Sequence, residues 1–409
     1  MAFLTLPLII LAISASIYLC LRRSGGKRIK PCQLPPGPYG LPWIGMLFQM
    51  PTNFAEEIVR LSQQHGAIYS LRMVRQRYVV VADAGIAQQL LVAQAAKTSC
   101  REGSYIASKA LWSGMGVITS MYGDTWRKHR QVLEQGLRSQ TADSAAEAMR
   151  QPLARLHARL AAHAWDEPEL QAVFAEYTLE VFLSTLLGPH HDRIPRSLFN
   201  QAIDAMNEML SYRRARRWRS NLEAIMGSIL DYIEPEQSST PVAPFGRLLV
   251  QMEEAGKIDT FEKCTLAMVW LTAANASFPG FYASFMKAIS SVPRVQLKVR
   301  QELDMDSGAD APFLPPARGD RLPYCRAVLL EAMRCNHATI DSPHVVTEDI
   351  TLKQWTIPAG TALLLDTWSI NHDETRFPRP MEFDTTHLSS SRSLGSRRLR
   401  HGLLIDQDF

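Results

Sequence analysis

The chain has 409 residues, of which 46% are hydrophobic, so it is long enough to bury a large core in one or two domains. Its 44 basic and 40 acidic residues leave a formal net charge of +4, which lacks the strong, clustered basic excess of a nucleic-acid-binding protein. Its six cysteines form no C-x-x-C pair, which argues against a zinc site or a disulfide framework and indicates a reducing compartment.

The first predicted element is a membrane-spanning helix at residues 2–21. This segment contains no charged residue and has about the ~20 residues that a helix needs to cross a bilayer. Five basic residues follow it between positions 22 and 30, and by the positive-inside rule they place the rest of the chain in the cytosol. A cleaved signal peptide is the alternative, although no basic region precedes the apolar run. We therefore expect a single-pass membrane protein with an anchor at residues 1–21.

A basic and proline-rich hinge is predicted at residues 22–42. Its prolines fix φ and remove hydrogen-bond donors, so this segment should be stiff and extended. Residues 68–73 and 78–82 are rich in β-branched and aromatic side chains, and the polar sequence at 75–77 separates them. This pattern predicts a small β-hairpin.

The middle of the chain is predicted to be helical, from about residue 86 to residue 335, because apolar residues recur at intervals of three and four. A Pro- and Gly-containing loop is expected at residues 306–323. Strands are then expected at three places: 350–352, 355–357 and 361–365. Residues 389–409 carry serines and arginines with few apolar side chains, which predicts either a solvated, disordered tail or a novel end created by splicing, a frameshift or a gene-model error.

Four motifs occur in order along residues 35–388. They are G-D-T-W-R-K-H-R at 123–130, E-A-M-R at 331–334, I-P-A-G-T at 357–361 and F-P-R-P-M-E-F-D at 377–384. The ordered set resembles the cytochrome P450 family of haem-thiolate monooxygenases. The resemblance implies a mainly α fold with small β-sheets over residues 43–388. It also implies haem, dioxygen, a small apolar substrate, an NADPH-cytochrome reductase as partner and the endoplasmic reticulum membrane.

The resemblance assigns roles to residues of two helices. Trp126 and Arg130 would reach the haem propionates, because they stand four residues apart on one helical face and can donate hydrogen bonds to an anion. A solvated basic helix is the alternative. Glu331 and Arg334 would form the buried ion pair that locks the family's fold, and an exposed helix salt bridge is the alternative.

Several positions depart from the family's pattern. On the helix that would pass over the haem, the usual acid and alcohol are Ala276 and Ser277, so only the weak hydrogen-bonding group of Ser277 remains as a candidate catalytic residue. Pro279 is expected to break or kink this helix. His344 stands where a propionate-binding arginine is usual, and His387 stands where an arginine usually joins Glu331 and Arg334.

The glycine-rich loop with the haem-ligating cysteine is absent from the sequence after residue 388, and no cysteine follows Cys335. Cys335 is best explained as a small buried apolar residue. We therefore expect a P450-like domain that is incomplete at the C-terminus and lacks a metal ligand. Two hypotheses remain open: a monooxygenase whose C-terminus is an error or a minor isoform, and a non-catalytic truncated membrane-anchored scaffold or small-molecule binder that is poorly soluble or short-lived.

Overall fold

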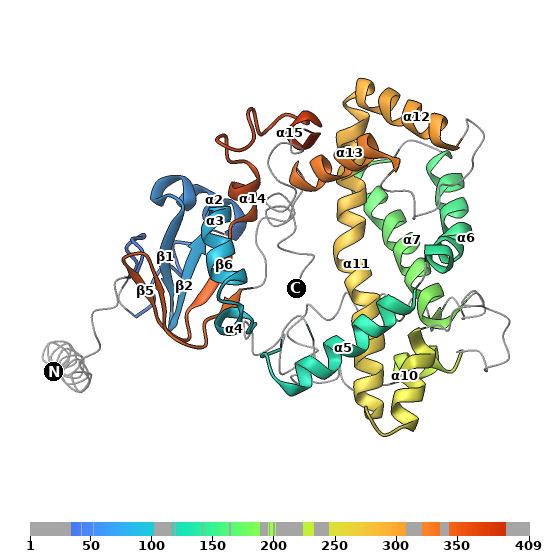
Figure 1. Cartoon of the computed structure of the whole chain (residues 1–409), viewed down its shortest axis with the longest axis horizontal. Helices are drawn as coiled ribbons and strands as arrows, with labels where there is room; N and C mark the ends of the chain where they lie inside the picture. Colours follow the sequence, from blue (N-terminus) through green and yellow to red (C-terminus); the bar gives the residue numbers. More distant parts are fainter. Residues whose placement is uncertain are drawn as a thin grey trace, which may run out of the picture.

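A small lobe built on a β-sheet and a larger helical lobe lie side by side (Figure 1). The computed structural model describes residues 34–41, 43–51, 53–101, 117, 120–140, 142–162, 165–188, 195, 197–198, 201, 224–232, 245–307, 321–335 and 343–389. The predicted anchor, most of the predicted hinge and nearly all of the predicted tail lie outside these residues. The mainly α architecture with small sheets is confirmed.

The first lobe is organised by a four-stranded sheet with the order β1-β2-β6-β3. β1 (Ile68–Met73) and β2 (Gln76–Val81) form an antiparallel hairpin, and β2 pairs in parallel with β6 (Ala362–Leu365). β6 pairs antiparallel with β3 (His344–Val345). The C-terminal part of the chain therefore completes a sheet that the N-terminal hairpin begins.

Short helices and a second hairpin surround this sheet. They are α2 (Phe54–His65), α3 (Ala84–Ala87), the π-helical turn η2 (Gln88–Val92), α4 (Ala95–Thr98) and the antiparallel strands β4 (Ile350–Leu352) and β5 (Trp355–Ile357). Successive side chains of a strand point to opposite faces, so Val79 and Val81 join one apolar cluster with η2 while Val80 joins another with α2. Both faces of the sheet are buried at residues 79–81 and along β6, which explains why these stretches are continuous apolar runs.

The helical lobe is formed mainly by helices of ten or more residues. They are α5 (Asp124–Ser139), α6 (Ala142–Leu160), α7 (Glu167–Leu187), α10 (Phe245–Glu254), α11 (Thr260–Ser290), α12 (Pro293–Ser307) and α13 (Pro323–Cys335). Two further short helices follow, α14 (Thr367–Asn371) and α15 (Thr386–Ser389), and α15 packs on α13 (Figure 1). The principal apolar cluster joins α5, α7, α10 and α11.

The helix α11 runs without interruption from Thr260 to Ser290 through Pro279. The expected break at this proline does not occur. A proline inside a helix costs about 3 kcal/mol through a lost hydrogen bond and a steric clash. Because Pro279 is itself buried and α11 packs along the length of α7, tertiary contacts offset that cost.

One helix among the described residues is long and apolar enough to cross a membrane, namely α7 at Glu167–Leu187. This helix packs against α6, α10 and α11 and contributes to the principal apolar cluster. Its apolar character is therefore accounted for by its place in the core of the lobe.

The strands predicted from the sequence are confirmed with small shifts. Gln76 and Arg77, expected in the connection between the first two strands, belong to β2, and the turn is reduced to residues 74 and 75. The reason is that Met73 pairs with Gln76, so the ladder continues to the last possible pair. The predicted strands at 350–352 and 355–357 match β4 and β5, and β6 begins at Ala362.

Candidate functional site

The helix α13 carries a buried ion pair. Arg334 Nε and Nη2 donate to the two carboxylate oxygens of Glu331 at 2.9 and 2.7 Å, and both side chains are 0% exposed. A spacing of three residues places the two side chains on one face of the helix. Burial lowers the pKa of Arg334, but the hydrogen bond and charge of Glu331 outweigh burial and raise it above its ordinary value. The pair is therefore a bidentate, charged contact.

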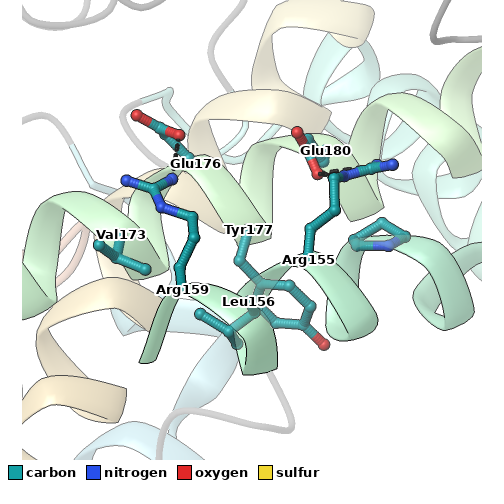
Figure 2. Close-up of a pocket in the computed structure, with 8 residues that line it drawn as sticks. Arg155, Leu156, Arg159, Val173, Glu176, Tyr177 and Glu180 are labelled. Atoms are coloured by element: carbon teal, nitrogen blue, oxygen red, sulfur yellow. Dashed lines mark hydrogen bonds and ion pairs between the residues drawn. The ribbon is translucent and has the colours of Figure 1, made fainter. Parts of the chain in front are cut away.

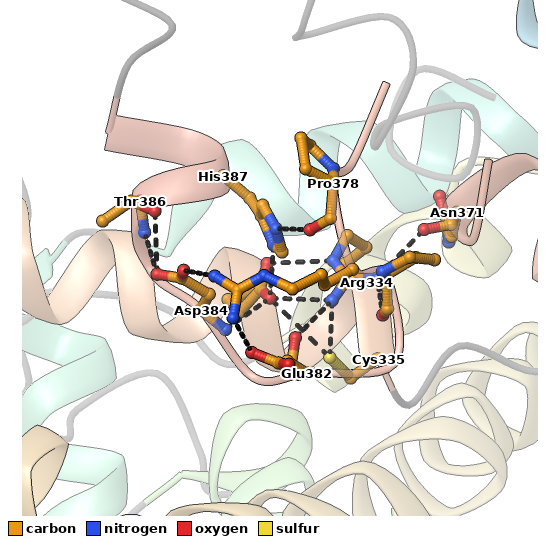
Figure 3. A network of polar contacts seen from close by, with 11 residues as sticks. Arg334, Cys335, Asn371, Pro378, Glu382, Asp384, Thr386 and His387 are labelled. Atoms are coloured by element: carbon orange, nitrogen blue, oxygen red, sulfur yellow. Dashed lines mark hydrogen bonds and ion pairs between the residues drawn. The ribbon is translucent and has the colours of Figure 1, made fainter. Parts of the chain in front are cut away.

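The remaining N–H groups of Arg334 hold the chain segment that follows α14 (Figure 3). Nη1 donates to the carbonyl oxygens of Asn371 and Pro380 at 3.0 and 2.7 Å, and Nη2 donates to the carbonyl of Glu382 at 3.1 Å. The guanidinium carbon lies 5.2 Å from the centre of the Phe377 ring. A buried charge needs its donors paired, so this one side chain holds residues 371–382 against α13.

His387 is the third side chain of this network (Figure 3). Its Nδ1 lies 3.0 Å from Glu331 Oε1, its Nε2 lies 2.6 Å from the carbonyl oxygen of Pro378, and its side chain is 5% exposed. Carboxylate and carbonyl oxygens only accept hydrogen bonds, so each ring nitrogen of His387 faces an acceptor. The structure therefore brings Glu331, Arg334 and His387 together, with a histidine at the position where an arginine is usual.

Trp126 and Arg130 lie on α5. The indole N–H of Trp126 donates to the carbonyl of Val117 at 2.9 Å, and Arg130 Nε donates to Glu134 at 2.8 Å. The side chain of Arg130 is half-buried, whereas that of Arg127 is exposed. The indole N–H of Trp126 and the Nε–H of Arg130 therefore donate hydrogen bonds to acceptors within the protein.

A second buried network joins α5 to the start of α11, and sequence reasoning missed it. His129 Nε2 lies 2.8 Å from Glu262 Oε1, and Lys128 forms an ion pair with the same carboxylate. Glu262 also forms a capping box with Asp259 at the N-terminus of α11. Burial raises the pKa of Glu262, but hydrogen bonds from Lys128, the Asp259 backbone and His129 outweigh burial and lower it below its ordinary value. The D-x-x-E spacing at 259–262 was the signal in the sequence that marks this helix start.

The other predicted site residues lie apart from these networks. His344 is buried in β3, and its Nδ1 lies 2.8 Å from the carbonyl oxygen of Thr98, so Nδ1 carries the proton and donates. Ser277 is exposed on α11, and the side chain of Ala276 lies outside the described residues. Trp126, Arg130 and His344 each have different protein partners.

The family model described as Cytochrome P450 matches residues 35–232 and 283–400. The chain belongs to the cytochrome P450 family. A cytochrome P450 monooxygenase of Arthrobotrys oligospora is 26% identical over 406 residues, which cover 88% of this chain and 73% of that protein. Cytochrome P450 81E8 of Medicago truncatula is 25% identical over 389 residues, which cover 86% of this chain and 76% of that protein. A zebra fish cytochrome P450 structure with progesterone has a TM-score of 0.70 at 20% identity and covers 81% of this chain and 82% of its own.

Members of this family normally bind haem, so the described residues can be tested for a fit to its propionates. The single N–H of Trp126 is used by the Val117 carbonyl, and the Nε of Arg130 is used by Glu134. With Nδ1 donating to Thr98, the Nε2 of His344 would donate to an anion only as imidazolium. The indole N–H of Trp126 is therefore used within the protein in the observed arrangement, and a propionate-binding role for Arg130 and His344 stays a prediction.

The described thiols likewise do not fit the axial ligand of a haem-thiolate protein, which must be a thiolate. Burial raises the pKa of Cys325 to about 12 and that of Cys335 to about 11, so both are thiols at neutral pH. Cys100 and Cys264 are buried in different lobes, the first hydrogen-bonded through its backbone to β3 and the second in the α5–α11 apolar cluster.

A cavity of about 330 Å³ lies between α6 and α7 of this P450 (Figure 2). Two ion pairs cross it: Arg155 donates to Glu180 at 3.0 and 3.1 Å, and Arg159 contacts Glu176. Burial raises the pKa of Tyr177, which lines the cavity, to about 12. Because each charged group of the rim is paired with its neighbour across the helices, the cavity offers no activated nucleophile or base.

Proposed function

We propose that this P450 is an oxidoreductase of the monooxygenase type that oxidises a small apolar molecule, such as a lipid, a terpenoid or a secondary metabolite. Dioxygen and electrons from an NADPH-cytochrome reductase are the co-reactants that the family relationship implies. The observation that carries the proposal is the complete network of Glu331, Arg334 and His387. A buried ion pair contributes little stability compared with apolar packing. Because stability alone does not explain why all three side chains are present, the network supports the proposal that the chain keeps the family's local geometry around α13.

The names of similar proteins support the class of reaction and of substrate. The similar proteins of Arthrobotrys oligospora and Penicillium terrestre are named as monooxygenases. The zebra fish structures contain abiraterone and progesterone, which are largely apolar molecules. An apolar substrate also agrees with a location at a membrane, where such molecules partition.

The proposed location is the endoplasmic reticulum membrane, with a single span at residues 2–21 and the body of the protein in the cytosol. The uncharged run at 2–21 and the basic residues that follow it support this location. Extraction of expressing membranes with alkaline carbonate should leave the chain in the pellet, and release into the supernatant would contradict an integral anchor.

The alternative is a non-catalytic, membrane-anchored scaffold or small-molecule binder. The observation that favours it is the state of the described thiols, because Cys325 and Cys335 are held in the protonated form and cannot act as thiolate ligands. Alanine at position 276, where the family has a proton-delivering acid, supports the same alternative.

The deciding experiment is a reduced carbon-monoxide difference spectrum of membranes that contain the 409-residue chain. The monooxygenase proposal expects a Soret band at the thiolate position, and single serine variants at Cys100, Cys264, Cys325 and Cys335 would then show which sulfur binds iron. Membranes that lack the chain serve as the control. Folded protein without such a band would overturn the monooxygenase proposal for this chain and leave the scaffold, whose ligand binding is then measured by displacement of an apolar fluorescent probe.

A further inference from the structure

The cavity between α6 and α7 lies where the two helices present matching faces to each other. Its lining residues follow the spacing i, i+3, i+4 and i+7 on both helices, which places each set on one helical face. The set on α6 is Pro152, Arg155, Leu156 and Arg159, and the set on α7 is Val173, Glu176, Tyr177 and Glu180. The volume of about 330 Å³ falls in the range of small-molecule sites, ~300–1,000 Å³, so the space between these faces can hold a ligand.

The floor of the cavity is apolar. Leu156 and Val173 are buried and share an apolar cluster with Ala283 of α11. Tyr177 packs against this cluster, and its ring centre lies 6.3 Å from that of Tyr282 on α11. Apolar surface that leaves water at this floor lowers the free energy, so the lower part of the cavity suits an apolar group.

The rim of the cavity carries two ion pairs. Arg155 pairs with Glu180 and Arg159 pairs with Glu176, and Tyr177 lies between the two pairs (Figure 2). The two arginine side chains are 48% and 45% exposed, so the rim is open to solvent. Because two cations and two anions balance, a ligand with a net charge would be attracted by one set of groups and repelled by the other.

The Arg155–Glu180 pair keeps hydrogen-bonding atoms for a ligand. Nε and Nη2 of Arg155 both donate to Oε2 of Glu180, at 3.1 and 3.0 Å. These bonds leave Nη1 of Arg155 as a donor and Oε1 of Glu180 as an acceptor. Since the two charges are in contact, a complementary ligand must carry a negative and a positive group beside each other. An α-amino acid does so, because one carbon atom carries both its carboxylate and its ammonium group.

We propose that the α6–α7 cavity binds a zwitterionic α-amino acid with an apolar side chain. Its carboxylate accepts from Nη1 of Arg155, its ammonium group donates to Oε1 of Glu180, and its side chain lies on the apolar floor. Because burial raises the pKa of Tyr177 to about 12, the phenol is uncharged at neutral pH and adds no further charge to the rim. The site is built from α6 and α7, so the proposal is independent of haem and of the monooxygenase function proposed above.

The test is equilibrium dialysis of the full chain in detergent micelles against radiolabelled probes with one apolar body and different charged groups. Phenylalanine carries both groups, hydrocinnamate carries only the carboxylate and phenethylamine carries only the ammonium group. Phenylalanine should bind most tightly, and each of the other two should bind about tenfold more weakly because one charged hydrogen-bond contact is lost. Micelles without protein measure the partition of each probe into detergent.

A double variant tests whether the probe occupies this cavity. Arg155→Met combined with Glu180→Leu removes both contacts and leaves no unpaired charge, so phenylalanine should bind about a hundredfold more weakly. The matched control is Arg150→Met combined with Glu147→Leu, an exposed ion pair on the same helix, which should leave binding unchanged. Val173→Phe fills the floor and should also weaken binding. It provides an independent variant if circular dichroism shows that the double variant is unfolded.

Each outcome bears on the proposal. Loss of phenylalanine binding in the folded cavity variants, with binding kept in the control, would support it. Equal retention of the three probes would indicate apolar partition, and tighter binding of hydrocinnamate than of phenylalanine would indicate an anion site; either result would overturn the zwitterion proposal. Phenylalanine binding that is undetectable up to the solubility limit, or unchanged in both the double variant and Val173→Phe, would overturn this cavity as the site.

Discussion

Two buried networks in this P450 use the same chemistry in different ways. Near α13, the carboxylate of Glu331 meets Arg334 and His387. Between α5 and α11, the carboxylate of Glu262 meets Lys128 and His129. Each network joins one acid, one permanent cation and one histidine.

The two networks differ in how completely their cations are shielded from water. Arg334 is 0% exposed and pairs through both sides of its guanidinium, whereas the Lys128 side chain is 41% exposed and acts as a single point charge. A fully buried ion must have all its hydrogen bonds, while a half-exposed one can use water instead. We therefore expect the α13 network to fail more severely than the α5–α11 network when one member is removed, and the following variants test this order.

The largest effect is expected for Arg334→Ala. This change removes the bidentate arginine from the buried Glu331 carboxylate and leaves three backbone carbonyls without the donors that Arg334 supplies, so it should cost about 3–5 kcal/mol of the free energy of unfolding. Since whole domains are stable by about 5–15 kcal/mol, the variant should be close to unfolding at room temperature. Urea titration of the full chain in detergent, followed by circular dichroism, measures the loss. A loss below about 1 kcal/mol would contradict a structural role for the pair.

A smaller loss is expected for His387→Phe. Phenylalanine fills the space but donates no hydrogen bond to Glu331 or to the Pro378 carbonyl, which should cost about 2–3 kcal/mol. His387→Arg serves as the matched variant, because arginine also supplies several donors. If the two variants are equally stable in the same titration, the hydrogen bonds of the side chain at position 387 do not contribute to stability.

Glu262→Gln tests the second network and should cost about 1–2 kcal/mol at neutral pH, because the amide loses the charge but keeps an acceptor. The folded-state pKa of Glu262 lies below its ordinary value of 4.5. Its contribution is therefore complete above pH 4.5 and is lost as the pH falls through the folded-state pKa. Denaturation curves at several pH values should show the parent and variant converging in acid. If the free energies of unfolding of parent and variant differ by the same amount at all pH values, the charge of Glu262 does not contribute to stability.

The smallest effect is expected for Arg379→Ala. Arg379 pairs with Glu382 at 2.6 Å, but the two side chains are 68% and 56% exposed. An exposed ion pair of this kind contributes about 0–1 kcal/mol because water screens it. The variant is also the control for Arg334→Ala, since it removes an arginine from the same segment. If Arg379→Ala lowers the free energy of unfolding as much as Arg334→Ala does, then any mutation in this part of the fold is damaging. The large effect of Arg334→Ala could then not be assigned to the buried ion pair.

Several features could be predicted because their signals are local. The enrichment in β-branched and aromatic residues around a polar connection predicts the β1–β2 hairpin, and the spacing of Glu331 and Arg334 predicts that they share a helix face. The partners of Arg334 could not be predicted in the same way. They are the backbone carbonyls of Asn371, Pro380 and Glu382, and every residue has such a group, so no side-chain pattern marks them.

The departures from expectation have similar causes. Pro279 predicts a broken or kinked helix when only the backbone is considered, but burial and packing against α7 keep α11 continuous, so the break does not occur. The sequence predicts only that His129 belongs to a basic helix. In the structure it contacts Glu262, which lies 133 residues further along the chain. Such contacts depend on how the helices pack, which the local pattern does not contain.

The sequence by itself determined the positions of most strands, the helical character of the middle of the chain, the family motifs and the positions of the unusual residues His344 and His387. Only the tertiary structure decided that β2 pairs in parallel with β6 and that both nitrogens of His387 face acceptors. The physical reason is that periodicity and spacing act between neighbours along the chain. Protonation states and pairing partners depend on atoms that only folding brings within hydrogen-bond distance.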